Sequence, residues 1–208
     1  MITLAFYTCL DKMYVVLKRD NVILSSKIVE NQDNKYHSAF LISNIREILK
    51  RNGLTPKDIT SIATDVGPGS FTGIRACTTV ARMLAQQLNI GLIGISSLEI
   101  LSRILGENDL VALDARKNKA YFYDEEIKGA IELEEVDKII KGKKVITDDS
   151  LYPRFSEICD EVISYQQNDY PLGEILTKIA EEKIESGIDT DWRKLKPLYI
   201  QPPPVFKK

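Results

Sequence analysis

The chain has 208 residues, of which 44% are hydrophobic and 28% are charged, and its formal net charge is −2. This is enough apolar material for one large domain or two small ones, and it excludes a wholly disordered chain. A nearly neutral balance argues against a broad basic face that holds nucleic acid, although it allows a subunit that helps a partner to do so.

Neither an export signal nor a membrane anchor is expected, because the amino-terminal sequence MITLAFYTCLDK has no basic region and no stretch is long and apolar enough to span a bilayer. Cys9, Cys77 and Cys159 show no C-x-x-C spacing, which favours reduced thiols over disulfides or a zinc site. Cys77 lies in an apolar helical pattern and is expected in the core. These features predict a cytoplasmic protein.

Periodicity divides the first half of the chain into strands and helices. Strands are expected at residues 2–8, 12–19, 22–29, 61–67 and 91–95, and helices at about 36–52, 72–88 and 96–105. Gly53 is expected to end the first helix in a left-handed conformation, and residues 55–58 to form a capped turn. The resulting βββαβα order defines an N-terminal subdomain over residues 1–105.

The second half is less regular and is assigned to a C-terminal subdomain over residues 106–208. Strands at 109–115 and 119–125 are expected to form a hairpin across residues 116–118, where Asp114 and Arg116 are expected to make a local turn and ion pair. Further strands are expected at 143–149 and 161–165, and a helix at 172–186. The proline-rich tail is expected to be extended, and its docking place, a partner or the N-terminal half, stays open. Trp192 is a candidate anchor for this tail.

The helices at 36–52 and 72–88 carry more apolar surface than one core needs. Leu41, Ile42, Ile45, Ile48 and Leu49 fall on one stripe of the first helix, with Phe40 off it, and the apolar arc of the second is wider than the roughly 100° of an ordinary surface helix. Two interpretations stay open: burial within the chain, or contact with a second protein. The candidate partner-interface residues are Phe40, Leu41, Ile45, Ile74, Cys77, Val80, Ala81, Met83 and Leu84.

The stretch GPGSFTGIR, residues 67–75, joins a predicted strand to a predicted helix. Free N–H groups at such a junction favour an anion, which makes Gly67, Gly69, Ser70, Thr72, Gly73 and Arg75 a candidate phosphate loop. The stretch matches neither a Walker A loop nor a Rossmann fingerprint. The alternative is that the glycines allow tight backbone packing and that Ser70 or Thr72 caps the helix.

The segment GPGSFTGIRACTTVARMLAQQLNIGLIGISSLEIL, residues 67–101, resembles the signature of the bacterial TsaB (YeaZ) family. Three other landmarks agree: His37-Ser38 at the first helix, Ala112-Leu113-Asp114-Ala115-Arg116 as a match to the family's "DAR", and Tyr199-Ile200-Gln201-Pro202-Pro203 near the end. The similarity covers nearly the whole chain in order.

The resemblance implies an α/β fold of the actin/Hsp70/sugar-kinase (ASKHA) type, with two βββαβα-like subdomains of which the second is degenerate. It implies a scaffold and activator that binds a TsaD catalytic subunit through its first two helices. With a TsaE ATPase, that complex forms N6-threonylcarbamoyladenosine at adenosine 37 of tRNAs that read codons beginning with A. The chain would meet tRNA only indirectly, and ATP or ADP at the complex interface stays open.

Several residues favour a non-catalytic subunit that requires no cofactor or metal of its own. Tyr7 stands where most relatives have the acid of a "DTS" motif, and a tyrosine cannot replace that carboxylate as a Mg²⁺ ligand. His37 is the single histidine, so a multi-histidine metal site is not expected. Peptidase activity is not expected either, because no H-E-x-x-H motif is present.

Two alternative functions stay open at this point. One is a nucleotide-binding enzyme of the ATPase or kinase type that uses the loop from Gly67 to Gly73. The other is a homodimeric scaffold with another role, because an exposed apolar face also favours self-association.

Overall fold

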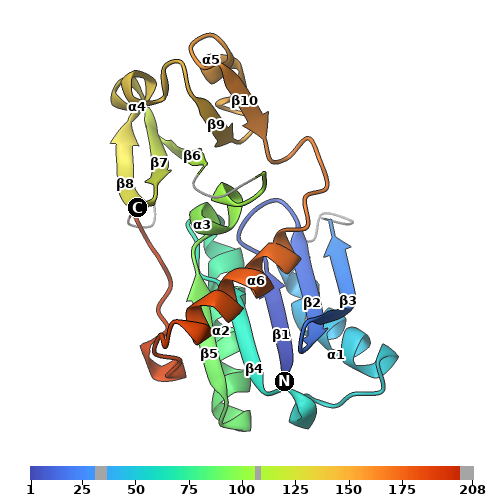
Figure 1. Cartoon of the computed structure of the whole chain (residues 1–208). Helices are drawn as coiled ribbons and strands as arrows, with labels where there is room; N and C mark the ends of the chain where they lie inside the picture. Colours follow the sequence, from blue (N-terminus) through green and yellow to red (C-terminus); the bar gives the residue numbers. More distant parts are fainter. Residues whose placement is uncertain (31–36, 106–108, 202–208) are drawn as a thin grey trace, which may run out of the picture. The chain divides into compact units, whose positions relative to one another are not determined.

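The computed structural model of the protein describes residues 1–30, 37–105 and 109–201, and for residues 37 and 38 it describes the backbone alone. The chain forms two compact units (Figure 1). The first combines Met1–Ser97 with Leu172–Leu198, and the second contains Leu98–Pro171 and residues 199–201. This division differs from the one expected at residue 105, because the last helix packs on the first sheet.

The first unit is built on a mixed five-stranded sheet. Its strands are β1 (Ile2–Tyr7), β2 (Met13–Arg19), β3 (Val22–Val29), β4 (Ser61–Asp65) and β5 (Gly91–Ile95), in the order β3-β2-β1-β4-β5. β2 is antiparallel to both neighbours, whereas β1, β4 and β5 are parallel. Parallel neighbours require helical crossovers, which here are α1 (Leu41–Arg51) and α2 (Phe71–Leu88).

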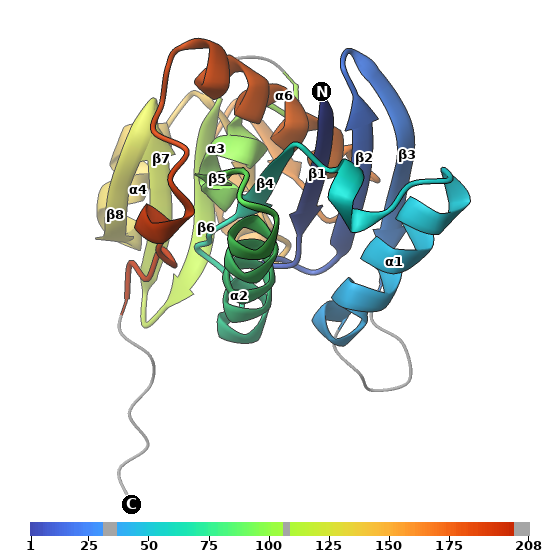
Figure 2. The same cartoon turned by 90° about the horizontal axis from the view of Figure 1, so that it is seen from below.

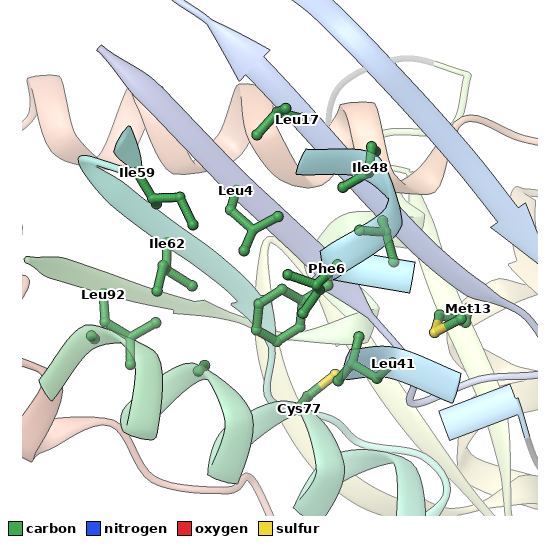
Figure 3. Close-up of a cluster of buried hydrophobic side chains, with 14 of the residues drawn as sticks. Leu4, Phe6, Met13, Leu17, Leu41, Ile48, Ile59, Ile62, Cys77 and Leu92 are labelled. Atoms are coloured by element: carbon green, nitrogen blue, oxygen red, sulfur yellow. The ribbon is translucent and has the colours of Figure 1, made fainter. Parts of the chain in front are cut away.

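One face of this sheet is covered by α1 and α2 (Figure 2). Alternate residues of the central strands, such as Leu4 and Phe6 of β1, pack there with Leu41 of α1 and Cys77 of α2 (Figure 3). Cys77 is fully buried, so its expected place in the core is confirmed. The period-two alternation of the strands therefore delivers one apolar row to this helical layer.

The opposite face is covered by α6 (Leu172–Glu185). Gly173 lies against Val16 and Tyr14 of β2, where a methyl group on Gly173 would come within 2.6 Å of Val16 Cγ2. Lys18, the next residue on this face, forms an ion pair with Glu181 of α6. Contact this close between helix and strand explains why α6 belongs to the first unit.

The segment after α6 also stays on the first unit. Leu92 donates a backbone hydrogen bond to Thr190 at 2.9 Å, and Leu198 donates one to Val66 at 2.8 Å. Between them, Trp192 begins the short helix η3 (Trp192–Lys194) and packs on the first core, while Arg193 lies 4.7 Å from the centre of its ring. The tail prolines fall outside the described residues.

The second unit repeats the topology of the first. Its strands are β6 (Leu110–Arg116), β7 (Lys119–Asp124), β8 (Glu126–Glu132), β9 (Lys144–Thr147) and β10 (Glu161–Ser164), in the order β10-β9-β6-β7-β8. Numbered from β6, this is the strand order of the first sheet. The crossover helices α4 (Leu133–Ile140) and α5 (Tyr152–Ser156) have 8 and 5 residues, against 11 and 18 in α1 and α2. The ASKHA-type fold is thus confirmed, and the degeneration lies in the helices of the second half.

The two units also share hydrogen bonds at corresponding positions. Thr64 Oγ1 donates to the Phe6 carbonyl at 3.1 Å, and Thr147 Oγ1 donates to the Ala112 carbonyl at 2.7 Å. Each threonine precedes an aspartate whose Oδ1 accepts a backbone N–H two residues on: Gly67 to Asp65 at 2.7 Å, and Ser150 to Asp148 at 3.1 Å. The same Thr-Asp pair therefore stands at the end of the corresponding parallel strand in both sheets, with Asp65 as the last residue of β4 and Asp148 as the first residue after β9.

Most predicted elements are confirmed within a few residues. The strands at 22–29 and 91–95 have the predicted bounds, and Gly53 has a φ of +66° beyond the end of α1. The capped turn is η2 (Pro56–Asp58), with Thr55 and Asp58 forming a capping box. The helix predicted at 36–52 begins as the 3₁₀ turn η1 (His37–Phe40), and the one predicted at 96–105 is the shorter α3 (Ser97–Ser102).

The sequence interpretation missed β8, α4 and α5. Strand β8 is mostly exposed or half-buried and contains a glycine with a φ of +103°, so it shows no clear apolar alternation. Helix α5 is too short to display a helical period.

The ion pair between Lys18 and Glu181 gives a test of how α6 is attached. Their side chains are only 11% and 20% exposed, so Glu181→Ala leaves a mostly desolvated ammonium group without its partner. We expect the free energy of unfolding to fall by about 1–3 kcal/mol. Urea denaturation followed by circular dichroism measures this change.

Glu185→Ala, which removes an exposed carboxylate of the same helix, is the matched control and should change stability by less than about 0.5 kcal/mol. Equal losses in the two variants would contradict a specific role for the pair.

Candidate functional site

The candidate site is the loop from Val66 to Ser70, which leaves β4 and enters α2. Its conformation includes a cis peptide bond between Gly67 and Pro68. The loop lies at the carboxyl ends of β1 and β4, the edge of a parallel sheet where ligands usually bind in α/β proteins. Side chains and backbone groups from β1, β4 and α3 fix it in place.

Asp65, the last residue of β4, lies beneath this loop and is fully buried. Its Oδ1 accepts the Gly67 N–H at 2.7 Å, and the Ser97 hydroxyl lies 3.0 Å from Oδ1 and 2.9 Å from Oδ2. Ser97 Oγ is also 2.8 Å from the Pro68 carbonyl, and the Ser97 N–H donates to the Gly67 carbonyl at 2.9 Å. Asp65 and Ser97 together therefore tie the loop to the start of α3.

Burial raises the pKa of the Asp65 carboxyl from its ordinary value of 3.8 to about 7. Hydrogen bonds from the Gly67 N–H, the Cys9 thiol and the Ser97 hydroxyl lower the pKa and offset only part of this effect. The geometry suits the neutral form, because Ser97 has one proton and three nearby acceptor oxygens. A protonated Asp65 can donate to Ser97 Oγ, which leaves the Ser97 proton for the Pro68 carbonyl.

Gly69 and Gly73 let the loop and the first turn of α2 rest on the backbone of residues 8 and 9. A Cβ atom at Gly73 would lie 1.9 Å from the Thr8 carbonyl oxygen, and one at Gly69 would lie 2.2 Å from the Cys9 carbonyl oxygen. No side chain fits at these distances, so both positions require glycine. The Ser70 N–H donates to the Cys9 carbonyl at 2.7 Å and completes the contact.

Thr8 and Ser70 fix the first turn of α2. Thr8 Oγ1 donates to the Gly73 carbonyl at 2.8 Å and lies 3.0 Å from the Cys77 sulfur. Ser70 is the N-cap, and its hydroxyl accepts the Gly73 N–H at 3.3 Å. The predicted cap is therefore Ser70, while Thr72 and Arg75 lie exposed beyond it.

The arrangement supports helix positioning over phosphate binding. The N–H groups of Gly67, Ser70 and Gly73 donate to Asp65, Cys9 and Ser70 within the chain, so in this conformation they are not directed at a ligand. The buried carboxyl of Asp65 beneath the loop would also repel an anion whenever it is ionised.

The candidate partner-interface residues divide into two groups. Five of them, Leu41, Ile45, Ile74, Cys77 and Ala81, are between 0% and 5% exposed and belong to the core of the first unit. The expectation that these side chains contact a partner is corrected by this burial. The wide apolar arc of α2 is used mainly within the chain, because the sheet, η1 and η3 all pack around this helix.

Two residues of the first helix lie differently from the helical projection. Phe40 is half-buried against the core, and Ile42, which was placed on the buried stripe, is 53% exposed. For Phe40 the cause is the 3₁₀ turn of η1, which ends at this residue, so the 3.6-residue count cannot be carried through it. Ile42 lies inside α1, at the edge of the stripe formed by the other apolar residues, and this edge is exposed.

The remaining candidates are the exposed and half-buried apolar residues of the helical layer. Met83 is 46% exposed, and Val80 and Leu84 on the same helix are half-buried. We call Phe40, Ile42, Val80, Met83 and Leu84 the α1–α2 surface. Of the nine residues proposed from the sequence, four belong to it, and Ile42 is added by the structure.

Tyr7 occupies the place of the acid expected at the end of the first strand. It is fully buried, and its ring lies edge-to-face with Tyr14 at 5.6 Å between centres. The side chain of His37 is outside the described part of the chain. Within the described residues, no group of three or more His, Cys, Asp or Glu side chains is placed to hold a metal ion.

Asp114 and Arg116 make the local turn expected of them. The Arg116 N–H donates to Asp114 Oδ1 at 2.8 Å, and the Asp114 N–H donates to Asp148 Oδ2 at 2.6 Å. The expected ion pair between the side chains of Asp114 and Arg116 is not among the contacts of the described residues.

Sequence reasoning missed Asp65, Ser97 and Thr8 as parts of the site. The signal for Asp65 was available, because this acid ends a predicted strand just before the glycine loop, at the edge of a sheet where functional side chains usually lie in α/β proteins. The role of Ser97 could not be predicted, because it is 32 residues from Asp65 in the sequence and only the fold brings the two side chains together.

Comparison with known proteins identifies the family. Residues 20–190 match the family model described as "TsaD: tRNA N6-adenosine threonylcarbamoyltransferase". The chain belongs to this family. Curated relatives then place it in the TsaB (YeaZ) branch. This confirms the resemblance carried by the GPGSFTGIR stretch.

Three relatives are named "tRNA threonylcarbamoyladenosine biosynthesis protein TsaB". The protein of Buchnera aphidicola subsp. Schizaphis graminum is 32% identical over 58% of this chain and 59% of its own length. The one from B. aphidicola subsp. Acyrthosiphon pisum is 28% identical over 79% and 78%. The Bacillus subtilis protein is 31% identical over 58% and 53%. The chain thus spans only just over half of the length of two of these relatives.

Solved structures agree on the fold. YeaZ from Pseudomonas aeruginosa superposes with a TM-score of 0.76 at 22% identity, over 95% of this chain and 99% of that chain. At this identity the match shows the fold alone. Among the described residues, no helix has both the length and the apolar character needed to cross a membrane.

The raised pKa of Asp65 makes stability depend on pH. The folded state holds the Asp65 proton more tightly than the unfolded state. The stabilisation that results is therefore full below pH 4 and is lost as the pH rises to about 7. Asp65→Asn has no such proton to lose. We therefore expect the free energy of unfolding to fall by up to about 4 kcal/mol less in this variant than in the parent protein between pH 4 and 8. Urea denaturation at a series of pH values measures it.

Asp160→Asn, at an exposed aspartate, serves as the control and should keep the pH dependence of the parent protein. If Asp65→Asn keeps it as well, the carboxyl does not titrate in this range.

Gly73→Ala tests the contact between α2 and β1. The added methyl group would meet the Thr8 carbonyl oxygen at 1.9 Å, so α2 must move or the loop must open. We expect a loss of at least about 2 kcal/mol of stability, measured by thermal denaturation, because the obstacle is backbone. Thr72→Ala at the neighbouring exposed position should stay within about 0.5 kcal/mol of the parent.

Proposed function

We propose that the protein is a non-catalytic subunit of the system that forms N6-threonylcarbamoyladenosine in tRNA. It binds a catalytic subunit of the TsaD type through the α1–α2 surface. The names of the curated relatives support the pathway. A TsaE-type ATPase completes the system, and tRNA is met through the complex.

The observation that carries the partner role is the exposure of two large apolar side chains on the helical layer. Ile42 on α1 is 53% exposed and Met83 on α2 is 46% exposed, with Val80 and Leu84 half-buried beside Met83. Side chains of this kind at the centre of an interface contribute most of the binding energy once a partner excludes water from them. The buried residues beneath keep both helices fixed before the partner arrives.

The hydrogen bonds of the loop support the non-catalytic role. Gly67, Ser70 and Gly73 donate their N–H groups within the chain, and Tyr7 is packed on Tyr14 where an acid would be needed for metal and phosphate. The loop instead sets the position of α2. No role in peptide hydrolysis follows from any of these groups.

The test is association with the TsaD-type subunit of the same organism. Met83→Asp places a charge on the exposed side of α2. We expect at least a tenfold weaker complex in co-purification and calorimetry, and a matching loss of modified tRNA in a reconstituted reaction. Ile42→Asp should act in the same direction. Phe40→Asp is a poorer probe, because Phe40 also packs on the core.

Ser186→Asp is the matched control, since it adds the same charge at an exposed position after α6, the helix on the opposite face of the sheet. Undiminished complex formation by both Met83→Asp and Ile42→Asp would overturn the proposal. If these variants lose only self-association of the chain, measured by sedimentation, the surface belongs to a homodimer instead.

A further inference from the structure

The turn of the β6–β7 hairpin has an unusual backbone. Arg116, Lys117 and Asn118 have φ values of +62°, +52° and +60°. The register of the two strands also shifts between Asp114 and Arg116, which leaves Ala115 as an extra residue. Three successive residues other than glycine in the left-handed region are rare, and the register shift shows that the turn is a bulged two-residue hairpin.

The residue types do not suit this backbone. A two-residue hairpin turn with positive φ at both central positions favours Asn-Gly, because glycine adopts the left-handed region without steric cost. Only Asn118 is a residue that tolerates it readily. Arginine and lysine are sterically disfavoured at positive φ, so the turn would be more stable with glycine in place of Arg116 and Lys117.

Hydrogen bonds from the body of the unit hold the turn in this form. The Arg116 N–H donates to Asp114 Oδ1 at 2.8 Å, and the Leu133 N–H donates to the Asn118 carbonyl at 2.9 Å. The Asp114 N–H is itself fixed by Asp148 Oδ2 at 2.6 Å. Strain that the surroundings impose in this way is typical of positions that contact a ligand.

The side chains of Arg116 and Lys117 are exposed, and neither takes part in an ion pair with a described residue. Other cations near the hairpin are neutralised: Lys119 pairs with Glu132 at 2.9 Å, and Lys128 pairs with Glu126 at 2.8 Å. The tip therefore presents two adjacent cations in a fixed position, on a chain whose net charge is −2.

We propose that Arg116 and Lys117 bind phosphate groups of the tRNA backbone. This rests on the proposed function, which brings tRNA to the complex. Two adjacent cations on a projecting turn suit neighbouring phosphates, with Arg116 able to make two parallel hydrogen bonds and Lys117 acting as a point charge. Contacts of this kind position a nucleic acid without reading its sequence. They also explain why costly residues occupy a turn that glycine would stabilise.

The test uses the reconstituted complex with the TsaD-type subunit and unmodified tRNA. We expect Arg116→Gly/Lys117→Gly to raise the KM for tRNA about tenfold. The slope of log affinity against log salt concentration should decrease by about 1.5, the value for two lost phosphate contacts. The same variant should be more resistant to thermal unfolding than the parent, because glycine relieves the turn. A turn with a purely structural role would gain stability and leave both tRNA measurements unchanged, which would overturn the proposal.

Lys138→Ala/Lys141→Ala removes the same charge from exposed positions at and just after α4 of the same unit, and it should leave the KM for tRNA within twofold. Equal losses in the two double variants would overturn a specific contact. If ATP or inorganic phosphate binds to the parent complex but not to the glycine variant, and tRNA binding is the same in both, the ligand of the turn is a small phosphate compound and the proposal of RNA is overturned. Co-purification with the TsaD-type subunit is measured in parallel. If the glycine variant forms a normal complex and keeps the KM and salt dependence of the parent for tRNA, this inference is rejected and the proposed function is not. If the parent itself does not form the complex, the proposed function fails.

Discussion

The position of α2 depends on a backbone contact that leaves no room for a side chain. Gly69 and Gly73 lie against the carbonyl oxygens of Cys9 and Thr8, and the Ser70 N–H and Thr8 hydroxyl close hydrogen bonds across the same contact. Because the first turn of α2 is fixed there, the direction of all 18 residues of the helix follows. Which side chains of α2 reach solvent, Met83 among them, is a consequence of this contact.

Beneath the loop, the Asp65 carboxyl joins β4 to the start of α3 at an electrostatic cost. Burial favours its neutral form, in which the carboxyl can donate to Ser97 Oγ while the Ser97 hydroxyl donates to the Pro68 carbonyl. A loop organised around a buried acid is poorly suited to hold a phosphate. The same edge of the sheet that binds ligands in many α/β proteins is used here to hold a helix.

The two units share the hydrogen bonds at the end of one parallel strand but differ in the helix that follows. In both, a threonine hydroxyl bonds the neighbouring parallel strand, and the following aspartate accepts a backbone N–H two residues on. After this shared step, the first unit continues into a glycine loop and a long helix, and the second into the five-residue α5. The long helix exposes Met83 on the first unit, whereas the second unit presents the cationic turn of β6–β7.

The sequence by itself determined nine of the ten strands in the described part of the chain, the long helices, a cap at Ser70 or Thr72, and the family. Each of these depends on local pattern: apolar period, capping residues and a contiguous motif. It could not decide which apolar residues face outward. Phe40 was misplaced by a 3₁₀ turn, Ile42 lies at the exposed edge of the stripe on α1, and the burial of Ile74 and Ala81 depends on packing around α2. Nor could it join Asp65 to Ser97 or assign α6 to the first sheet. Those contacts link residues far apart in the chain, and only the folded backbone brings them within hydrogen-bond and van der Waals distance.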